Sequence, residues 1–278
     1  MDSPKTPVRK RELRDSAGLL IGSGQVAGVL GLRRISDHVE PYFFRTMEEL
    51  ENLSVNGKYP IAGVARRLMV RWPDEALGIV ARGCDERHLI ELVKKGSIAG
   101  DRLRLIGLAC TREEADECRC ERPFPTRVNA GERIGLCEYP PDAEMEMMLD
   151  MEIWDRRRYW TDVFSRCIKC YGCRNSCPLC NCDDCRLEES RWVRVGEIPP
   201  EFPSFHLIRA FHLADKCVGC GACERACPMG IPLREFHRLI REEVKSLFDY
   251  EAGLAIDEKS PLITDFEQGP MKVTPDGL

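Results

Sequence analysis

The chain has 278 residues, with 41 Lys and Arg against 46 Asp and Glu, 43% hydrophobic residues and 16 cysteines. This length and hydrophobic content suffice for one or two ordinary cores, so covalent stapling does not explain the cysteines. The formal net charge of −5 shows no basic excess, which argues against a nucleic-acid binder.

The N-terminal stretch predicts neither a secretory signal nor a membrane span. A charged run at residues 9–12 stands where a signal would be apolar. The longest uncharged run, residues 17–32, has 16 residues and several glycines, which makes it too short and too polar for a transmembrane helix. Its glycines at 22–28 predict a flexible turn rather than a nucleotide-binding loop. We therefore expect a reducing, cytoplasmic location, where disulfides are rare.

Hydrophobic periodicity predicts an α/β domain over residues 1–150. The expected elements are a helix over 60–72, a buried strand over 76–81, an amphipathic helix over 85–95 and a second buried strand over 103–109. A strand, helix, strand unit implies a short parallel sheet. A further helix over 143–160 is expected to lead out of this domain.

The rest of the chain predicts a second domain and a tail. Residues 151–248 contain short cysteine-rich loops and two predicted helices, over 205–214 and 232–248, the second with a clear apolar face. Residues 249–278 contain seven acids and two bases, and they show little periodicity. We expect this irregular acidic tail to be mobile or to wrap a partner.

One cysteine pattern, Cys-x-x-Cys-x-x-Cys-x-x-x-Cys-Pro, occurs twice, fifty residues apart. The spacing lets one tight loop, eased by Gly172, Gly219 and Gly221, present three thiolates to a cubane. In two-cluster ferredoxins the fourth cysteine ligates the other cluster. We therefore assign two 4Fe–4S clusters in a ferredoxin-like α+β domain. Their predicted ligands are Cys167, Cys170, Cys173 and Cys227 for cluster 1, and Cys217, Cys220, Cys223 and Cys177 for cluster 2.

Zinc is the alternative for these motifs, because paired Cys-x-x-Cys units also form tetrahedral zinc sites. A zinc ion takes four ligands and does not need a third thiolate at the same step, followed by Cys-Pro. The complete duplicated pattern therefore favours iron and sulfur over a zinc-stabilised binding module.

Eight further cysteines could raise the number of clusters above the minimum of two, to three or four, or could be core or redox-inert thiols. Cys84 and Cys110 follow the two predicted strands, and the carboxyl ends of neighbouring parallel strands lie side by side. Four of the five cysteines in this region could hold a third cluster: Cys84, Cys110, Cys118, Cys120 and Cys137. Three more follow Cys177 directly, either as additional ligands or as buried thiols near a cluster: Cys180, Cys182 and Cys185.

These strings resemble the beta subunits of deazaflavin-dependent hydrogenases and formate dehydrogenases, especially the ferredoxin-like members found beside heterodisulfide reductase-type proteins. The resemblance covers residues 80–233 and includes RGCDERHLIELVKKGSIAGDRLRLIGLAC and both ferredoxin motifs. It implies an α/β domain with a cluster, a two-cluster ferredoxin domain and a role as an electron conduit in a larger complex. Several relatives also bind FAD. Relatives have Cys-x-x-Cys where this chain has Cys118-x-Cys120, so the third ligand set stays open.

We predict a cytoplasmic iron–sulfur electron-transfer subunit that is not itself catalytic. Its expected partners are other subunits of a hydrogenase, formate dehydrogenase or heterodisulfide reductase-type complex, with no nucleic acid. The alternative is an FAD-containing subunit that exchanges hydride with a deazaflavin or nicotinamide coenzyme, although no flavin-binding motif stands out. His206 and His212 are predicted to be ordinary helix-surface residues rather than proton-coupled neighbours of a cluster, and His88, one turn after Cys84, could form a hydrogen bond in the same crevice.

Overall fold

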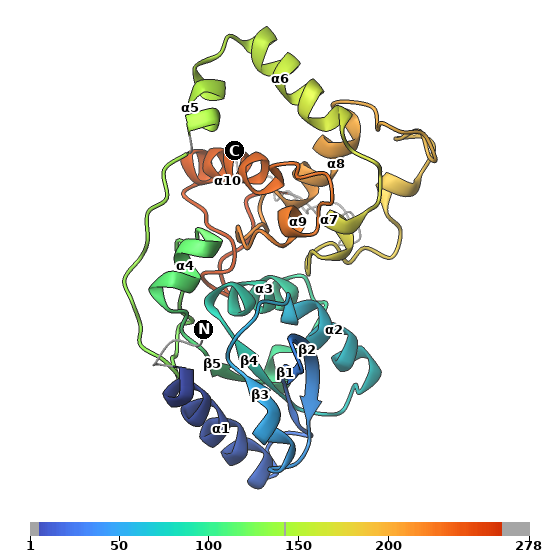
Figure 1. Cartoon of the computed structure of the whole chain (residues 1–278). Helices are drawn as coiled ribbons and strands as arrows, with labels where there is room; N and C mark the ends of the chain where they lie inside the picture. The colour runs from blue at the N-terminus through green and yellow to red at the C-terminus, as the bar shows by residue number, and fades with distance from the viewer. Residues whose placement is uncertain (1–5, 142, 263–278) are drawn as a thin grey trace, which may run out of the picture.

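The computed structural model describes residues 6–141 and 143–262. A sheet with flanking helices occupies one end of the molecule, and the helices of the cysteine-rich segment occupy the other (Figure 1). The elements up to residue 118 are α1 (Thr6–Gly22), β1 (Val29–Ile35), β2 (His38–Phe44), η1 (Glu49–Asn52), β3 (Leu53–Ser54), α2 (Ile61–Arg71), β4 (Leu77–Ala81), α3 (Gly83–Lys94), η2 (Gly100–Arg102), β5 (Leu103–Gly107) and α4 (Arg112–Cys118). The later ones are α5 (Ala143–Asp150), α6 (Ile153–Ser165), α7 (Gly172–Asn175), η3 (Arg186–Glu188), α8 (Ser204–Leu213), α9 (Ala222–Arg225) and α10 (Leu233–Phe248).

The sheet is mixed, with strand order β2-β1-β4-β5 and β3 paired to β1. The predicted unit β4-α3-β5 is confirmed, since β4 and β5 pair in parallel from Leu77↔Leu103 to Ala81↔Gly107. The expectation of a purely parallel sheet is wrong. A hairpin with a two-residue turn joins β1 to β2 in antiparallel register, and β3 adds a second antiparallel pair. A two-residue connection permits only antiparallel neighbours, whereas β4 and β5 need the α3 crossover.

Helices cover both faces of this sheet. On one face α1 buries Leu13 and Ala17 against the strands, and on the other α2 and α3 bury Ala65 and Leu89. The predicted helix over 60–72 is α2, which begins directly after Pro60. The predicted glycine-rich turn connects α1 to β1, and Gly24 has a φ of +68° there.

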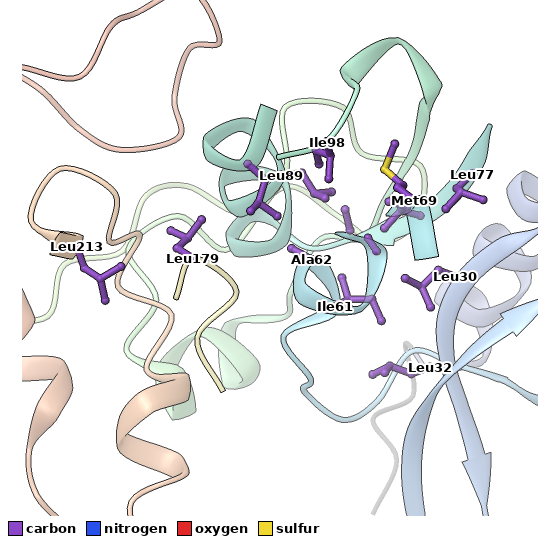
Figure 2. Close-up of a cluster of buried hydrophobic side chains, with 14 residues drawn as sticks. Leu30, Leu32, Ile61, Ala62, Met69, Leu77, Leu89, Ile98, Leu179 and Leu213 are labelled. Carbon is purple, nitrogen blue, oxygen red and sulfur yellow. The ribbon is translucent and has the colours of Figure 1, made fainter. Parts of the chain in front are cut away.

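The core between the sheet, α2 and α3 continues into the cysteine-rich segment. Leu179 and Leu213 belong to the same buried cluster as Leu30, Leu77 and the other core residues (Figure 2). The side chains of Cys177, Cys180 and Cys217 pack against this cluster. The cysteine loops are thus fixed on the α/β domain by apolar contact.

The cysteine-rich segment has its own helical core. Phe164 of α6 is fully buried, with its ring centroid 5.0 Å from that of Phe236 on α10, as predicted from the apolar face of α10. The helix expected over 143–160 is interrupted after Asp150 and continues as α6, so that Met148 and Trp160 share this core. The ferredoxin-like domain was predicted to be α+β. No strand forms within residues 143–262, so this part of the prediction is wrong for the described residues.

The tail packs on the protein over residues 249–262, and residues 263–278 lie outside the described part of the chain. The carboxylate of the buried Glu91 on α3 accepts hydrogen bonds from the Gly253 amide, at 2.8 Å, and the Tyr250 hydroxyl, at 3.3 Å. Glu251 pairs with Arg122 at 2.9 Å. The start of the acidic tail is therefore bound to the α/β domain of its own chain.

No helix in the described ranges is both long enough and apolar enough to cross a membrane.

Candidate functional site

The two cysteine motifs form matching loops, each leading into a single helical turn. In the second loop Gly219 and Gly221 have φ values of +69° and +70°, as their predicted turn role requires. In the first loop the equivalent positions are Lys169 and Tyr171, at +49° and +57°. Gly172 has a different role from the predicted one. A Cβ built on it would lie 2.7 Å from the Ala226 carbonyl oxygen, so this glycine permits close approach of the two loops.

The four thiols predicted for cluster 1 line one cavity. Cys167, Cys170, Cys173 and Cys227 surround it together with Phe205, His206 and Ile231, and its volume is about 370 Å³. Burial raises the pKa of the Cys167 and Cys173 thiols, and the negative charges of the neighbouring cysteines, Cys227 among them, raise it further. The fourth cysteine of the second motif thus lies with the first three of the first motif.

The thiols predicted for cluster 2 also lie together. Burial raises the pKa of Cys217, and it raises that of Cys220 to about 12; the Cys177 thiolate adds to both shifts. Cys223 is raised in the same way. The pKa of Cys177 is itself lowered, because the Cys180 thiol donates a hydrogen bond to its thiolate. Both crossed groups predicted from the spacing are therefore spatial groups.

The three cysteines that follow Cys177 do not gather into one site. Cys180 lies beside Cys177 and packs on the α/β core. Cys182 is exposed, and Cys185 lies beside Arg174. This dispersal favours the interpretation of Cys180 as a buried thiol near a cluster, and leaves the three without a shared metal site within residues 6–141 and 143–262.

Four of the five cysteines in the first region gather at the carboxyl ends of β4 and β5. Cys84 lies at the start of α3, and its pKa is raised well above the ordinary value by burial and by Asp85, Cys120, Cys220 and Cys110. Burial raises the pKa of Cys110 to about 12, with contributions from the charges of Cys120 and Cys118. The predicted strand-end crevice therefore contains Cys84, Cys110, Cys118 and Cys120.

Cys137 has different neighbours. Its sulfur lies 3.6 Å from the Arg112 guanidinium and 3.7 Å from the Gly135 carbonyl oxygen, and it takes part in a hydrogen bond with Tyr139. Its backbone amide donates to the Glu121 carbonyl, so the segment is held close to the other cysteines without its sulfur joining them. Of the five candidates, Cys137 is the one that the structure sets apart.

Two glycines allow the segment carrying residues 122–127 to close over this crevice. A Cβ on Gly83 would lie 2.4 Å from the Phe124 carbonyl oxygen, and one on Gly107 would lie 1.8 Å from the Arg127 carbonyl oxygen. Real Cβ atoms do not approach backbone oxygens so closely. Gly83 begins α3 directly before Cys84, and Gly107 ends β5 shortly before Cys110.

We predict that Gly107→Ala destabilises the α/β domain strongly. The new methyl group would force the 127 backbone away from β5, and overpacking of this kind costs about 1–3 kcal/mol, with backbone clashes at the upper end. Chemical unfolding of anaerobically purified protein measures the change. Gly135→Ala is the matched control, because a Cβ there has no neighbour within 4 Å. Equal stabilities of the two variants would contradict the close packing at Gly107.

An arginine-lined cavity lies beside both the strand-end thiols and the second motif. Its volume is about 410 Å³, and Cys120 and the loop residues Val218 and Gly219 contribute to its wall. Five arginines outnumber two glutamates around it: Arg87, Arg119, Arg234, Arg238 and Arg241 against Glu121 and Glu235. Cys84 and Cys220 pack in the same buried cluster nearby. Glu242 pairs with Arg238, and Glu251 lies 3.9 Å from Arg87, so carboxylates outside the lining balance part of this positive charge.

The donor chemistry of the three thiol groups fits 4Fe–4S clusters. Each group supplies four cysteines, and these side chains are buried or half-buried except for the exposed Cys170. Within the described ranges no three His, Cys, Asp or Glu side chains lie close enough together to hold a single metal ion. Thiolates that ligate a cubane bind four different iron atoms, so they do not converge on one point.

Of the two histidines predicted on a helix surface, His212 is exposed but His206 is buried, and His88 is buried as well. His206 lines the cluster 1 cavity and stacks on Phe164 with ring centroids 3.8 Å apart. Burial lowers the pKa of His206 and of His88 to about 3, with nearby arginines adding to the effect. His212 is exposed on α8. Neutral, buried histidines do not carry charge near the clusters, whereas Arg209, which the sequence did not single out, does.

Comparison with known proteins points to iron–sulfur chemistry as well. Residues 212–232 match the family model of a 4Fe-4S binding domain. The chain is 39% identical over 109 residues to the F420-dependent formate dehydrogenase subunit beta of Methanocaldococcus jannaschii. The matched segment covers 39% of this chain and 28% of that protein. The chain is 40% identical over 102 residues to F420-dependent formate dehydrogenase 1 subunit beta of Methanococcus maripaludis, covering 37% and 26%. The resemblance predicted from the sequence is confirmed, and each match spans about a quarter of the relative's length.

Proposed function

We propose that this chain is an iron–sulfur electron-transfer subunit of a multisubunit oxidoreductase, working in the cytoplasm without catalysing a reaction itself. The observation that carries the proposal is the crossed grouping of the two cysteine motifs into two sets of four thiols. The match to a 4Fe-4S binding domain and the similarity to formate dehydrogenase beta subunits support it.

Bound clusters would supply one-electron storage, and the residues of the chain would hold and shield them. Cys167, Cys170, Cys173 and Cys227 would ligate one cluster, and Cys217, Cys220, Cys223 and Cys177 the second. We assign a third to Cys84, Cys110, Cys118 and Cys120. Because Cys84 packs beside Cys220, the second site would lie between the third and the first. Such an order suits a conduit that connects one partner subunit at the α/β domain to another at the cysteine-rich end.

The test is the iron and acid-labile sulfide content of protein purified without oxygen. We expect about twelve iron atoms per chain, four for each cluster. About eight would support the paired motifs and remove the third assignment, and about sixteen would bring in Cys180, Cys182 and Cys185. A colourless protein with zinc and little iron would replace electron transfer by a structural metal role.

A flavin-containing subunit is the second candidate, and the arginine-lined cavity is the observation that favours it. Its five arginines could donate hydrogen bonds to the phosphates of FAD beside the strand-end thiols. The absorbance of released flavin, measured on the same preparation as the iron, separates this candidate from a conduit made of clusters alone.

A further inference from the structure

Arg209 is a buried cation between the two predicted cluster sites of the cysteine-rich segment. It lies on α8, one turn after His206, and is 7% exposed. Its Nη2 donates to the Cys173 carbonyl oxygen at 3.0 Å, and its Nη1 lies 2.6 Å from Nε2 of His237 on α10. The side chain thus joins the end of the first motif to the helix that follows the second.

No carboxylate balances this charge. In the part of the chain that the structure describes, no Asp or Glu lies within ion-pair distance of Arg209, and its Nε has no hydrogen-bond partner. His237 is neutral, because burial and nearby arginines, Arg209 first among them, lower its pKa to about 3. An isolated buried charge is costly unless it is paired. The compensating negative charge must therefore come from another source.

As cluster ligands, the cysteines of both motifs would supply that charge. Arg209 contacts the Cys173 carbonyl and forms a hydrogen bond with the Cys180 side chain, and it lies near enough to Cys177 and Cys223 to interact with their charge. Cys173 belongs to the cluster 1 group, whereas Cys177 and Cys223 belong to the cluster 2 group. The guanidinium therefore lies near cysteines of both sites.

Resting on the proposed function, we propose that Arg209 is a shared electrostatic residue that raises the reduction potentials of both clusters. One-electron reduction adds one negative charge to a cluster, with no bond formed or broken. A fixed positive charge in a poorly solvated interior stabilises that added charge. Local charge and hydrogen bonding are among the factors that set cluster potentials. Because Arg209 has contacts on both sides, its removal acts on the pair rather than on one cluster.

The experiment is a redox titration of the full chain, followed by electron paramagnetic resonance, for wild type, Arg209→Gln and Arg209→Lys. Gln keeps a donor for the Cys173 carbonyl and removes the charge, whereas Lys keeps the charge. We expect Arg209→Gln to lower the reduced-to-oxidised ratio of both clusters about tenfold at a fixed potential, equivalent to about 59 mV for a one-electron couple. Arg209→Lys should stay within about threefold of wild type.

Arg33→Gln is the control, since it removes the same charge from the distant β1–β2 hairpin, where Arg33 pairs with Glu40. Unchanged potentials in Arg209→Gln with full iron content would overturn the proposal, as would a shift of one cluster only. If Arg209→Gln loses its iron, the test rests on Arg209→Lys. A tenfold fall in the reduced-to-oxidised ratio of its clusters, with the charge kept, would show that hydrogen bonding rather than charge sets the potentials. Absence of iron in wild type would instead refute the proposed function.

Discussion

Alanine at Cys177 and alanine at Cys220 should remove the same cluster, although the two cysteines belong to different motifs. The Cys177 thiolate lies with Cys217, Cys220 and Cys223, so it completes their set. Because the Cys180 thiol lies within hydrogen-bonding distance of Cys177 and could replace it as a ligand, the informative variant is Cys177→Ala combined with Cys180→Ala. Iron analysis should show a loss of about four atoms per chain in this variant and in Cys220→Ala.

The combined variants test the crossing directly. Adding Cys220→Ala to the Cys177→Ala and Cys180→Ala pair should cost no further iron, because one cluster is already absent. Adding Cys170→Ala instead should raise the loss to about eight iron atoms per chain, since Cys170 lines the cluster 1 cavity. The reverse pattern would mean that each motif ligates its own cluster. Cys182→Ala, at an exposed position, controls for the effect of losing a cysteine and should retain all the iron.

The crossed assignment is predicted from the duplicated pattern together with the rule for two-cluster ferredoxins, in which the fourth cysteine ligates the other cluster. Three cysteines at three-residue intervals define a loop, and the duplicated pattern with its terminal Cys-Pro leaves few arrangements for the fourth ligand. The unit β4-α3-β5 was predictable for a similar reason: each strand is a short apolar run next to a clear amphipathic helix. Cys84 and Cys110 then follow from the rule that parallel strands end at one edge.

The elements before α2 were not predictable in the same way. Helix α1 buries Arg9, whose guanidinium contacts the Ala109 carbonyl and the Glu114 carboxylate, so its inner face does not look apolar in sequence. Strand β2 is only half-buried along most of its length and contains Pro41, which weakens the strand signal. Helix α1 depends on partners about a hundred residues away, and β2 depends on its pairing with β1. Arg209 escaped attention for the same reason, because its partners come from α10 and both cysteine loops.

The identity of the fourth ligand in the α/β domain is the remaining question that mutation can decide. Cys110 and Cys137 make a matched pair, since they are 6% and 4% exposed and differ chiefly in their neighbours. Cys110 shares its surroundings with Cys118 and Cys120, whereas the Cys137 sulfur contacts Arg112. We predict that Cys110→Ala loses about four iron atoms per chain and that Cys137→Ala loses none.

The remaining clusters provide a second readout of the same pair. Cys84 packs beside Cys220, so a cluster held by Cys84 and Cys110 would lie next to the second site and couple magnetically to it when both are reduced. In Cys110→Ala the resonance of the second cluster should narrow while its iron stays, and in Cys137→Ala the spectrum should match wild type. Loss of iron from Cys137→Ala with retention in Cys110→Ala would move the third site away from the strand ends. A loss of similar size in both variants would show that the segment from 110 to 137 folds around its cluster as one unit, with Cys137 inside the ligand set.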